Sequence, residues 1–195
     1  MWAVVPVKEF AGAKQRLSPV LSPAERAKLY AEMLDRVLAM LLATKGLDGV
    51  AVVTNEARVA RPGIRIIPDR ECRGQSAAVA QGARVLAAEG ASGILTIPGD
   101  VPLATPAEIE LVLATHGMAW RAMTIVPSRD GKGTNALAIS PPALIPFHFG
   151  DSSFDPHCAE ARALGIEPRI LRLPGLGLDI DTPDDLAALR ATAIA

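Results

Sequence analysis

Aromatic side chains are scarce in this chain: they make up only 4% of its 195 residues, although half of all residues are apolar. Alanine, valine, leucine and isoleucine therefore supply the hydrophobic surface, which suits strands and helices packed in layers. A chain of this length buries roughly 70% of its unfolded surface when it folds as one unit. No low-complexity tract or long linker divides the sequence, so we expect a single domain over residues 1–195.

Cysteine is equally rare, and long hydrophobic runs are missing. The two cysteines, Cys72 and Cys158, form no C-x-x-C pair, and the three histidines lack the spacing of a zinc site. Two unpaired thiols in a reducing compartment are the simpler interpretation. No stretch reaches roughly 18 uninterrupted apolar residues, and no basic segment precedes the apolar run at residues 2–7. The sequence therefore predicts a cytoplasmic protein without a membrane partner.

An excess of positive charge is also missing. The formal net charge is -1, and the basic residues are scattered along the chain. Proteins that bind long nucleic acids normally gather lysine and arginine on one face. We therefore expect no nucleic-acid partner and a small molecule as any anionic ligand.

Short runs rich in valine and isoleucine predict strands, and the segments between them carry apolar residues three and four apart, as helices do. The expected strands are residues 2–7, 49–54, 64–67, 93–98, 122–127, 136–140 and 169–173. Strands that alternate with helices favour an α/β sandwich of three layers, with a mostly parallel sheet covered on both faces. Ligands of such sheets bind beyond the carboxyl ends of the strands.

Three predicted helices begin with the same chemical pattern. Ser22, Thr105 and Thr182 are each followed by proline and, at the third helical position, by a carboxylate. The hydroxyl accepts from an amide of the first turn, proline fits the first helical position, and the carboxylate returns to the cap. These residues fix where the preceding loops end.

A basic segment follows the first predicted strand. Lys8, Lys14 and Arg16 place three cations within nine residues, and together they can neutralise a triphosphate and a departing pyrophosphate. The segment is not a Walker loop, because G-x-x-x-x-G-K-[ST] is absent. A solvated basic loop without a ligand is the alternative.

Three aspartates follow buried-looking segments and are candidates for a metal site. Asp100 comes directly after Gly99 at the end of a strand, and Asp179 and Asp181 are two apart in an extended segment, so they point to one face. Two such carboxylates repel by roughly 4 kcal/mol at about 4 Å and an effective dielectric constant near 20, unless a cation lies between them. Magnesium is normally held by one or two carboxylates and substrate phosphates. The alternatives are a turn at Asp100 and solvent-facing capping by Asp181.

Two polar loops can bind a second anion. Thr134 and Asn135 end a glycine-rich loop between two apolar strands, and glycine lets backbone amides approach an anion closely. Residues 149–157 enter a helix near Ser153, where free amides can hold a phosphate or carboxylate. A hairpin turn and ordinary helix capping explain the same residues equally well. We assign no catalytic role to His157.

A third polar segment, residues 68–78, leads into a helix. It carries amide and hydroxyl groups that suit the reading of a base edge, and its candidate nucleotide-binding residues are Asp69, Gly74, Gln75 and Ser76. A capped surface loop without a ligand is the alternative.

Taken in order, these segments resemble the 2-phospho-L-lactate guanylyltransferase family, which acts in making the deazaflavin coenzyme F-420. The resemblance covers almost the whole chain. Its specific parts are Pro6-Val7-Lys8, Ala13-Lys14-Gln15-Arg16-Leu17-Ser18, Gly99-Asp100-Val101-Pro102, Gly133-Thr134-Asn135, Phe149-Gly150 with Ser153-Phe154, and Leu178-Asp179-Ile180-Asp181-Thr182-Pro183.

The resemblance implies a Rossmann-like, sugar-nucleotide-transferase-like fold with a mostly parallel mixed sheet, and a magnesium-dependent transfer of GMP from GTP. The acceptor would be 2-phospholactate, phosphoenolpyruvate or 3-phosphoglycerate, and pyrophosphate would leave. By matching positions, Asp100, Asp179 and Asp181 would hold magnesium, and Lys8, Lys14, Arg16 and Asp100 would be catalytic. The acceptor would lie on Thr134, Asn135, Gly150 and Ser153. A possible homodimer is left open.

One departure concerns the base. The family usually has Gly-Leu-Asn before the third long helix, whereas this chain has Gly74-Gln75-Ser76. Gln75 can supply amide contacts in place of the asparagine.

Two other functions compete with this prediction. Enzymes of the same fold that act on a sugar phosphate or a molybdenum cofactor precursor usually open with Gly-Gly-x-Ser/Thr-x-Arg, whereas Pro6-Val7-Lys8 stands here. A GTP-binding module without catalysis is the alternative from another class, and the three candidate carboxylates argue against it.

Overall fold

The computed structural model describes residues 1–70 and 73–192. Cys158 is a free, buried thiol, as the sequence predicts, whereas Cys72 and its neighbour Glu71 lie outside the described residues.

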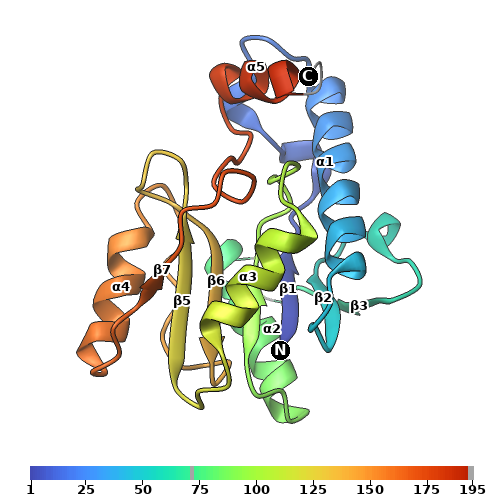
Figure 1. The fold of residues 1–195 in the computed structure, drawn as a ribbon. Helices are drawn as coiled ribbons and strands as arrows, with labels where there is room; N and C mark the ends of the chain where they lie inside the picture. The colour runs from blue at the N-terminus through green and yellow to red at the C-terminus, as the bar shows by residue number, and fades with distance from the viewer. Residues whose placement is uncertain (71–72, 193–195) are drawn as a thin grey trace.

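Seven strands form one sheet in the order β3-β2-β1-β4-β6-β5-β7 (Figure 1). Their bounds are β1 Trp2–Pro6, β2 Gly49–Val53, β3 Ile64–Ile67, β4 Ile94–Thr96, β5 Ala122–Pro127, β6 Thr134–Ser140 and β7 Arg169–Ile170. β1 pairs in parallel with β2 and β4, β2 with β3, and β5 with β7. β6 alone runs against its neighbours β4 and β5. The expectation of a mostly parallel mixed sheet is therefore confirmed.

The antiparallel strand brings an additional loop to the functional edge of the sheet. β5 and β6 form a hairpin, and β5 runs in the same direction as β4 through their shared neighbour β6. The loop from β5 to β6 therefore lies at the edge where β1, β2 and β4 end.

Within the described residues, five α-helices flank the sheet: α1 Pro23–Ala43, α2 Gln75–Ala88, α3 Pro106–His116, α4 Phe154–Ala163 and α5 Pro183–Thr192. α1 and α3 begin with complete capping boxes from Ser22 and Thr105. At α5, the backbone N–H of Thr182 donates to Asp185 at 2.9 Å and the Asp185 N–H donates to the Thr182 hydroxyl at 3.3 Å. All three predicted helix starts are confirmed.

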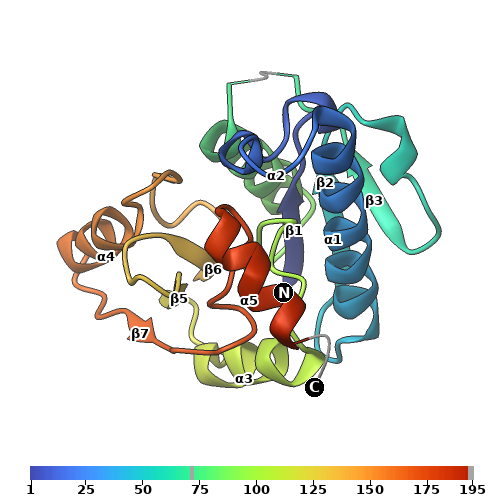
Figure 2. The same cartoon turned by 90° about the horizontal axis from the view of Figure 1, so that it is seen from above.

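The helices cover both faces of the sheet, which gives three layers (Figures 1 and 2). α1, α3 and α5 pack against the face of the sheet to which Val5 of β1 points. α2 and α4 pack against the opposite face, to which Val4 points. Neighbouring strand residues point to opposite faces, and both faces are apolar because both are covered.

The structure departs from the sequence prediction at short elements. Three 3-10 helices, η1 Phe10–Gly12, η2 Gln15–Leu17 and η3 Ala57–Val59, were not expected. β7 has only two residues instead of the five expected at 169–173, because it pairs only with Thr124 and Ile125 of β5. Among the residues described, no helix is long and apolar enough to cross a membrane.

A buried histidine joins α3 to the sheet and makes stability depend on pH. His116 Nδ1 lies 3.3 Å from Thr124 Oγ1, and its Nε2 lies 2.9 Å from Ser140 Oγ. Burial, with the nearby charges of Arg169 and the N-terminus, lowers the pKa of His116 to about 4. The unfolded chain takes up the proton near pH 6.5. Stability is therefore lost as the pH falls from about 6.5 towards 4.

We expect His116→Gln to reduce this dependence on pH. Urea unfolding at pH 7 and pH 5 should show that the variant loses less unfolding free energy between the two values than the parent does, by about 1–2 kcal/mol. His148→Gln, which changes an exposed histidine, is the control. Equal losses in parent and His116→Gln would contradict the assignment.

Candidate active site

Two adjoining cavities lie at the carboxyl edge of the sheet. The first has a volume of about 820 Å³ and extends from the end of β1 to the start of α2. The second, of about 560 Å³, lies between the β5–β6 loop and the start of α4. The residues that line both are Arg16, Gln75, Pro98, Asp100, Asp151 and Asp181. The two cavities therefore meet at one charged cluster.

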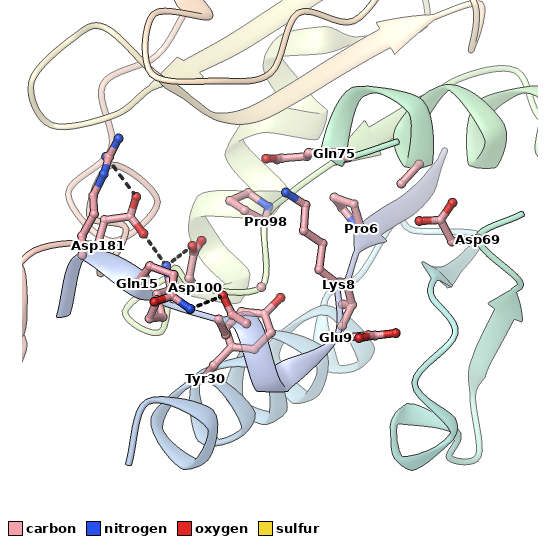
Figure 3. Close-up of a pocket in the computed structure, with 18 of the residues that line it drawn as sticks. Pro6, Lys8, Glu9, Gln15, Tyr30, Asp69, Gln75, Pro98, Asp100 and Asp181 are labelled. Carbon is pink, nitrogen blue, oxygen red and sulfur yellow. Dashed lines mark hydrogen bonds and ion pairs between the residues drawn. The ribbon is translucent and has the colours of Figure 1, made fainter. Parts of the chain in front are cut away.

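Lys14 forms the centre of that cluster, and its two partners, Asp100 and Asp181, are labelled in Figure 3. Its Nζ contacts Asp100 Oδ2 and lies 2.6 Å from Asp181 Oδ1, and only 5% of its side chain is exposed. Burial alone would lower the pKa of Lys14, but the two carboxylates outweigh it and raise the pKa. The buried ammonium is therefore charged, and it neutralises two aspartates far apart in the sequence.

Close packing against α1 explains why glycine precedes Asp100. A Cβ on Gly99 would lie 2.9 Å from Leu34 Cδ1 and 3.2 Å from the Tyr30 hydroxyl, both on α1. Close packing of this turn on α1 directs the Asp100 side chain to Lys14. The other carboxylate oxygen, Asp100 Oδ1, is buried and has no hydrogen-bond partner among the described residues. A buried carboxylate oxygen without a partner is costly unless a ligand completes the site.

The segment that carries Asp179 and Asp181 is attached to this turn through its backbone. The Ile180 N–H donates to the Asp100 carbonyl at 3.0 Å. On either side of Ile180, Asp181 faces Lys14, and Asp179 accepts a hydrogen bond of 3.0 Å from Asn135 Nδ2. Both carboxylates line the second cavity, as their spacing predicts. Burial raises the pKa of Asp179, the Asn135 bond opposes the rise, and the charge of Asp100 adds to it.

The carboxylates suit a divalent cation, although they do not form a complete cage. Among the described residues, no group of three acidic, histidine or cysteine side chains is placed to hold a metal ion. Magnesium usually needs only one or two carboxylates from the protein and takes its other ligands from water and phosphate. Asp100 and Asp181 already share one cation, the Lys14 ammonium, and Asp100 has an unpartnered oxygen. The residues present therefore fit such an ion.

The second cavity contains the predicted acceptor residues. Ser153 precedes α4 but makes no side-chain capping bond, which rules out ordinary capping by its hydroxyl in this structure. It donates instead to Thr134 Oγ1 at 3.1 Å. A side chain on Gly150 would meet no atom within 4 Å, so the backbone there is open to the cavity. The amide of Asn135 binds Asp179, and direct contact of Asn135 with an acceptor stays a prediction.

The remaining residues predicted to bind the nucleotide line the first cavity, except Ser76. Lys8, Asp69, Gly74 and Gln75 line the first cavity together with Lys14 and Arg16 (Figure 3). Ser76 is not among the described lining residues of either cavity, and its hydroxyl accepts a hydrogen bond of 2.9 Å from the Phe149 N–H. Ser76 therefore connects α2 to the loop that carries Gly150, and its contact with a nucleotide stays a prediction.

Several residues of the site were not assigned from the sequence. Asp151 binds Arg16 at 2.6 Å across the boundary between the cavities. Tyr30 reaches the first cavity from the middle of α1, where no local sequence pattern marks it. Asp130 accepts from Ser128 Oγ at 2.6 Å and from the Lys132 N–H at 3.0 Å, which orders the β5–β6 loop. An aspartate two residues after serine in a glycine-rich turn was the available signal for Asp130.

Two solved structures of the same fold bear the names of nucleotide-transferring enzymes. A nucleotide-diphospho-sugar transferase from Desulfovibrio desulfuricans superposes with a TM-score of 0.78 at 18% identity, over 98% of this chain and 86% of that one. A nucleotidyl transferase from Methanothermobacter thermautotrophicus superposes with a TM-score of 0.70 at 21% identity, over 99% and 97%. The fold is therefore that of the nucleotide-diphospho-sugar transferases, with two cavities meeting at an acidic cluster.

Sequence relatives narrow this class. The family model described as "Guanylyl transferase CofC like" matches residues 1–191. A phosphoenolpyruvate guanylyltransferase from Rubrobacter xylanophilus is 40% identical over 98% of this chain and 94% of its own length. A 2-phospho-L-lactate guanylyltransferase from Methanothermobacter thermautotrophicus is 35% identical over 96% and 82%. The chain belongs to the CofC-like guanylyl transferase family.

We expect Gly99→Ala to disturb both folding and catalysis. The added methyl group would press on Leu34 and Tyr30, and overpacking of this kind costs about 1–3 kcal/mol of unfolding free energy. The displaced turn would also move Asp100, so turnover should fall. Gly12→Ala is the matched control for stability, because its Cβ meets no atom within 4 Å. Turnover is compared with the parent, because Gly12 lines the first cavity. A Gly99→Ala variant with the melting temperature of Gly12→Ala and the turnover of the parent would show that the turn accommodates a methyl group.

Proposed function

We propose that this enzyme transfers GMP from GTP to a small phosphorylated carboxylic acid and releases pyrophosphate, in biosynthesis of the deazaflavin coenzyme F-420. The observation that carries the proposal is the position of Asp100, Lys14 and Asp181 where two cavities meet. Two anionic substrates can approach this cluster from opposite sides. The relatives are named phosphoenolpyruvate guanylyltransferase and 2-phospho-L-lactate guanylyltransferase. These names supply the transferred guanylyl group and the class of acceptor.

GTP is assigned to the first, larger cavity. Lys8, Lys14 and Arg16 line it near the cluster and can neutralise the triphosphate. Asp69 lines only this cavity, and Gln75, the first residue of α2, lies where the two cavities meet. Guanine offers an amino donor that the Asp69 carboxylate can accept, and its carbonyl oxygen can accept from an amide. This arrangement supports guanine as the base.

Magnesium is assigned to the carboxylates of the cluster. Asp100 and Asp181 would hold it, with Asp179 beside them, and the Asp100 oxygen that lacks a partner supports this position. When bound, the ion would neutralise charge on the phosphates and draw electron density from the α-phosphorus. Lys14 occupies the space between the carboxylates, so we propose that its ammonium turns to the triphosphate on substrate binding.

The acceptor is assigned to the second cavity, on Thr134, Gly150 and Ser153. An oxygen of its phosphate is ionised at neutral pH and can attack the α-phosphorus in line, so no protein nucleophile is required. Lys14 and Arg16 can stabilise the charge that collects on pyrophosphate as it leaves. Positioning and charge neutralisation would supply most of the rate enhancement.

We expect Asp100→Asn and Asp181→Asn each to lower turnover by at least about a hundredfold while the protein stays folded, because each change removes charge but little volume. Pyrophosphate release measures turnover, and circular dichroism follows folding. Asp184→Asn, an exposed change on α5, is the control and should retain activity. Near-normal turnover in both site variants would rule out the magnesium assignment.

Phosphoenolpyruvate is the acceptor we favour, slightly over 2-phospholactate, with 3-phosphoglycerate third. The first two carry the phosphate on the carbon beside the carboxylate, which suits two anions held by closely spaced groups. An extra hydroxyl left unpaired in the pocket would cost roughly 1–3 kcal/mol. Specificity constants for each acceptor, with GTP and magnesium, measure the order. A tenfold or greater preference for 3-phosphoglycerate would overturn this argument, and activity with none would overturn the proposed function.

A further inference from the structure

A buried histidine lies directly behind the second cavity. His157 is in the first turn of α4, four residues after Ser153, so the two side chains share one face of the helix. Thr134, the first residue of β6, lies beside both. The exposed fractions of His157, Ser153 and Thr134 are 0%, 2% and 6%, and only the hydroxyl residues line the cavity. No step of the proposed reaction uses His157.

The surroundings of His157 determine which ring nitrogen carries the proton. The backbone N–H of His148 donates to His157 Nε2 at 2.9 Å. A backbone N–H cannot accept, so Nε2 must present its lone pair. Burial lowers the pKa of His157 to about 4, so the ring is neutral at pH 7. A neutral ring has one proton, which must therefore be on Nδ1.

The Nδ1 proton determines what Thr134 can do. Nδ1 lies 3.1 Å from Thr134 Oγ1, so the hydroxyl of Thr134 accepts this hydrogen bond. Thr134 also accepts from Ser153 Oγ at 3.1 Å. A threonine hydroxyl has two lone pairs and one proton. With both lone pairs used, only its proton is left for a ligand.

The same conclusion holds if the bond between the two hydroxyls is reversed. The pair has two protons, and one of them always lies between the two oxygens. The bond from His157 uses neither, so one hydroxyl proton remains in either arrangement. The opposite histidine tautomer would accept that proton at Nδ1 and leave the pair with lone pairs towards the cavity.

We propose that His157 is a positioning residue that, through Thr134, keeps the hydroxyl pair of the second cavity as a hydrogen-bond donor to the anionic acceptor. This rests on the proposed function of that cavity. Carboxylates and phosphates accept hydrogen bonds, so a pair fixed as donor favours them over ligands that donate. The histidine thus contributes to acceptor selection without touching the acceptor.

Two variants separate donation to Thr134 from simple support of the fold. Asparagine places an amide N–H near the position of Nδ1, and glutamine places its amide near Nε2. His157→Asn keeps a donor for Thr134, whereas His157→Gln keeps an acceptor for the His148 N–H and leaves Thr134 without its donor. We expect His157→Gln to raise KM for phosphoenolpyruvate about tenfold, with KM for GTP and kcat changed less than about twofold. His157→Asn should restore most of the affinity.

Thr134→Val tests whether His157 acts through Thr134. Adding His157→Gln to Thr134→Val should raise KM for phosphoenolpyruvate no further, since the residue that receives the hydrogen bond is gone. His116→Gln, a buried histidine away from both cavities, is the control for lost stability and should leave KM for phosphoenolpyruvate unchanged. Equal KM values in His157→Gln, His157→Asn and the parent would overturn the inference, as would additive effects in the double variant.

A measurement without turnover distinguishes this inference from the proposed function. If the parent releases no pyrophosphate with any of the three acceptors, the proposed function fails. Nitrogen-15 shifts of the His157 ring then test the inference on the same protein. A proton on Nδ1 at pH 7 is the expected result, and a proton on Nε2 would overturn it.

Discussion

One buried ammonium group holds the site together. Lys14 comes from the segment after β1, Asp100 from the turn after β4 and Asp181 from the segment before α5, and the Lys14 Nζ is the point where the three meet. A backbone hydrogen bond from Ile180 to Asp100 keeps two of these segments in register. Without a cation between them, the two carboxylates would repel each other in a poorly solvated place. The basic segment therefore stabilises the folded state, in addition to its proposed role in nucleotide binding.

The two cavities on either side of this cluster differ in their chemistry. The first contains the cations Lys8, Lys14 and Arg16 among its carboxylates, and these cations can neutralise a nucleoside triphosphate. The second ends on two hydroxyls whose hydrogen bonds are fixed by a histidine behind them. Because the reacting phosphate oxygen would need no activation by a base, the protein's task is to position two anions and to neutralise them. Hydrogen-bond donors fixed before the acceptor arrives, as at Thr134 and Ser153, suit that task.

Much of the architecture follows from local patterns. The three hydroxyl-proline-carboxylate starts predict where α1, α3 and α5 begin, because each cap satisfies amides within its own turn. The 3-10 helices after β1 were missed, since a single short turn has too few residues to show a period. The length of β7 was also missed, because a strand ends where its partner stops pairing with it, and the partner β5 lies far away in the sequence.

The sequence by itself determined the class of the fold and the types of residue in the site: the basic segment, the three aspartates and the two polar loops. These follow from residue type and order, which a chain displays before it folds. Only the tertiary structure decided the partners: Asp181 with Lys14, Asn135 with Asp179, and Ser153 with Thr134 rather than with its own helix. The same holds for His157. A hydrogen bond from the His148 backbone sets its tautomer, and this tautomer determines the hydrogen bond that Thr134 accepts. Hydrogen bonds between residues on different elements and loops depend on distances that only the packed sheet and helices define.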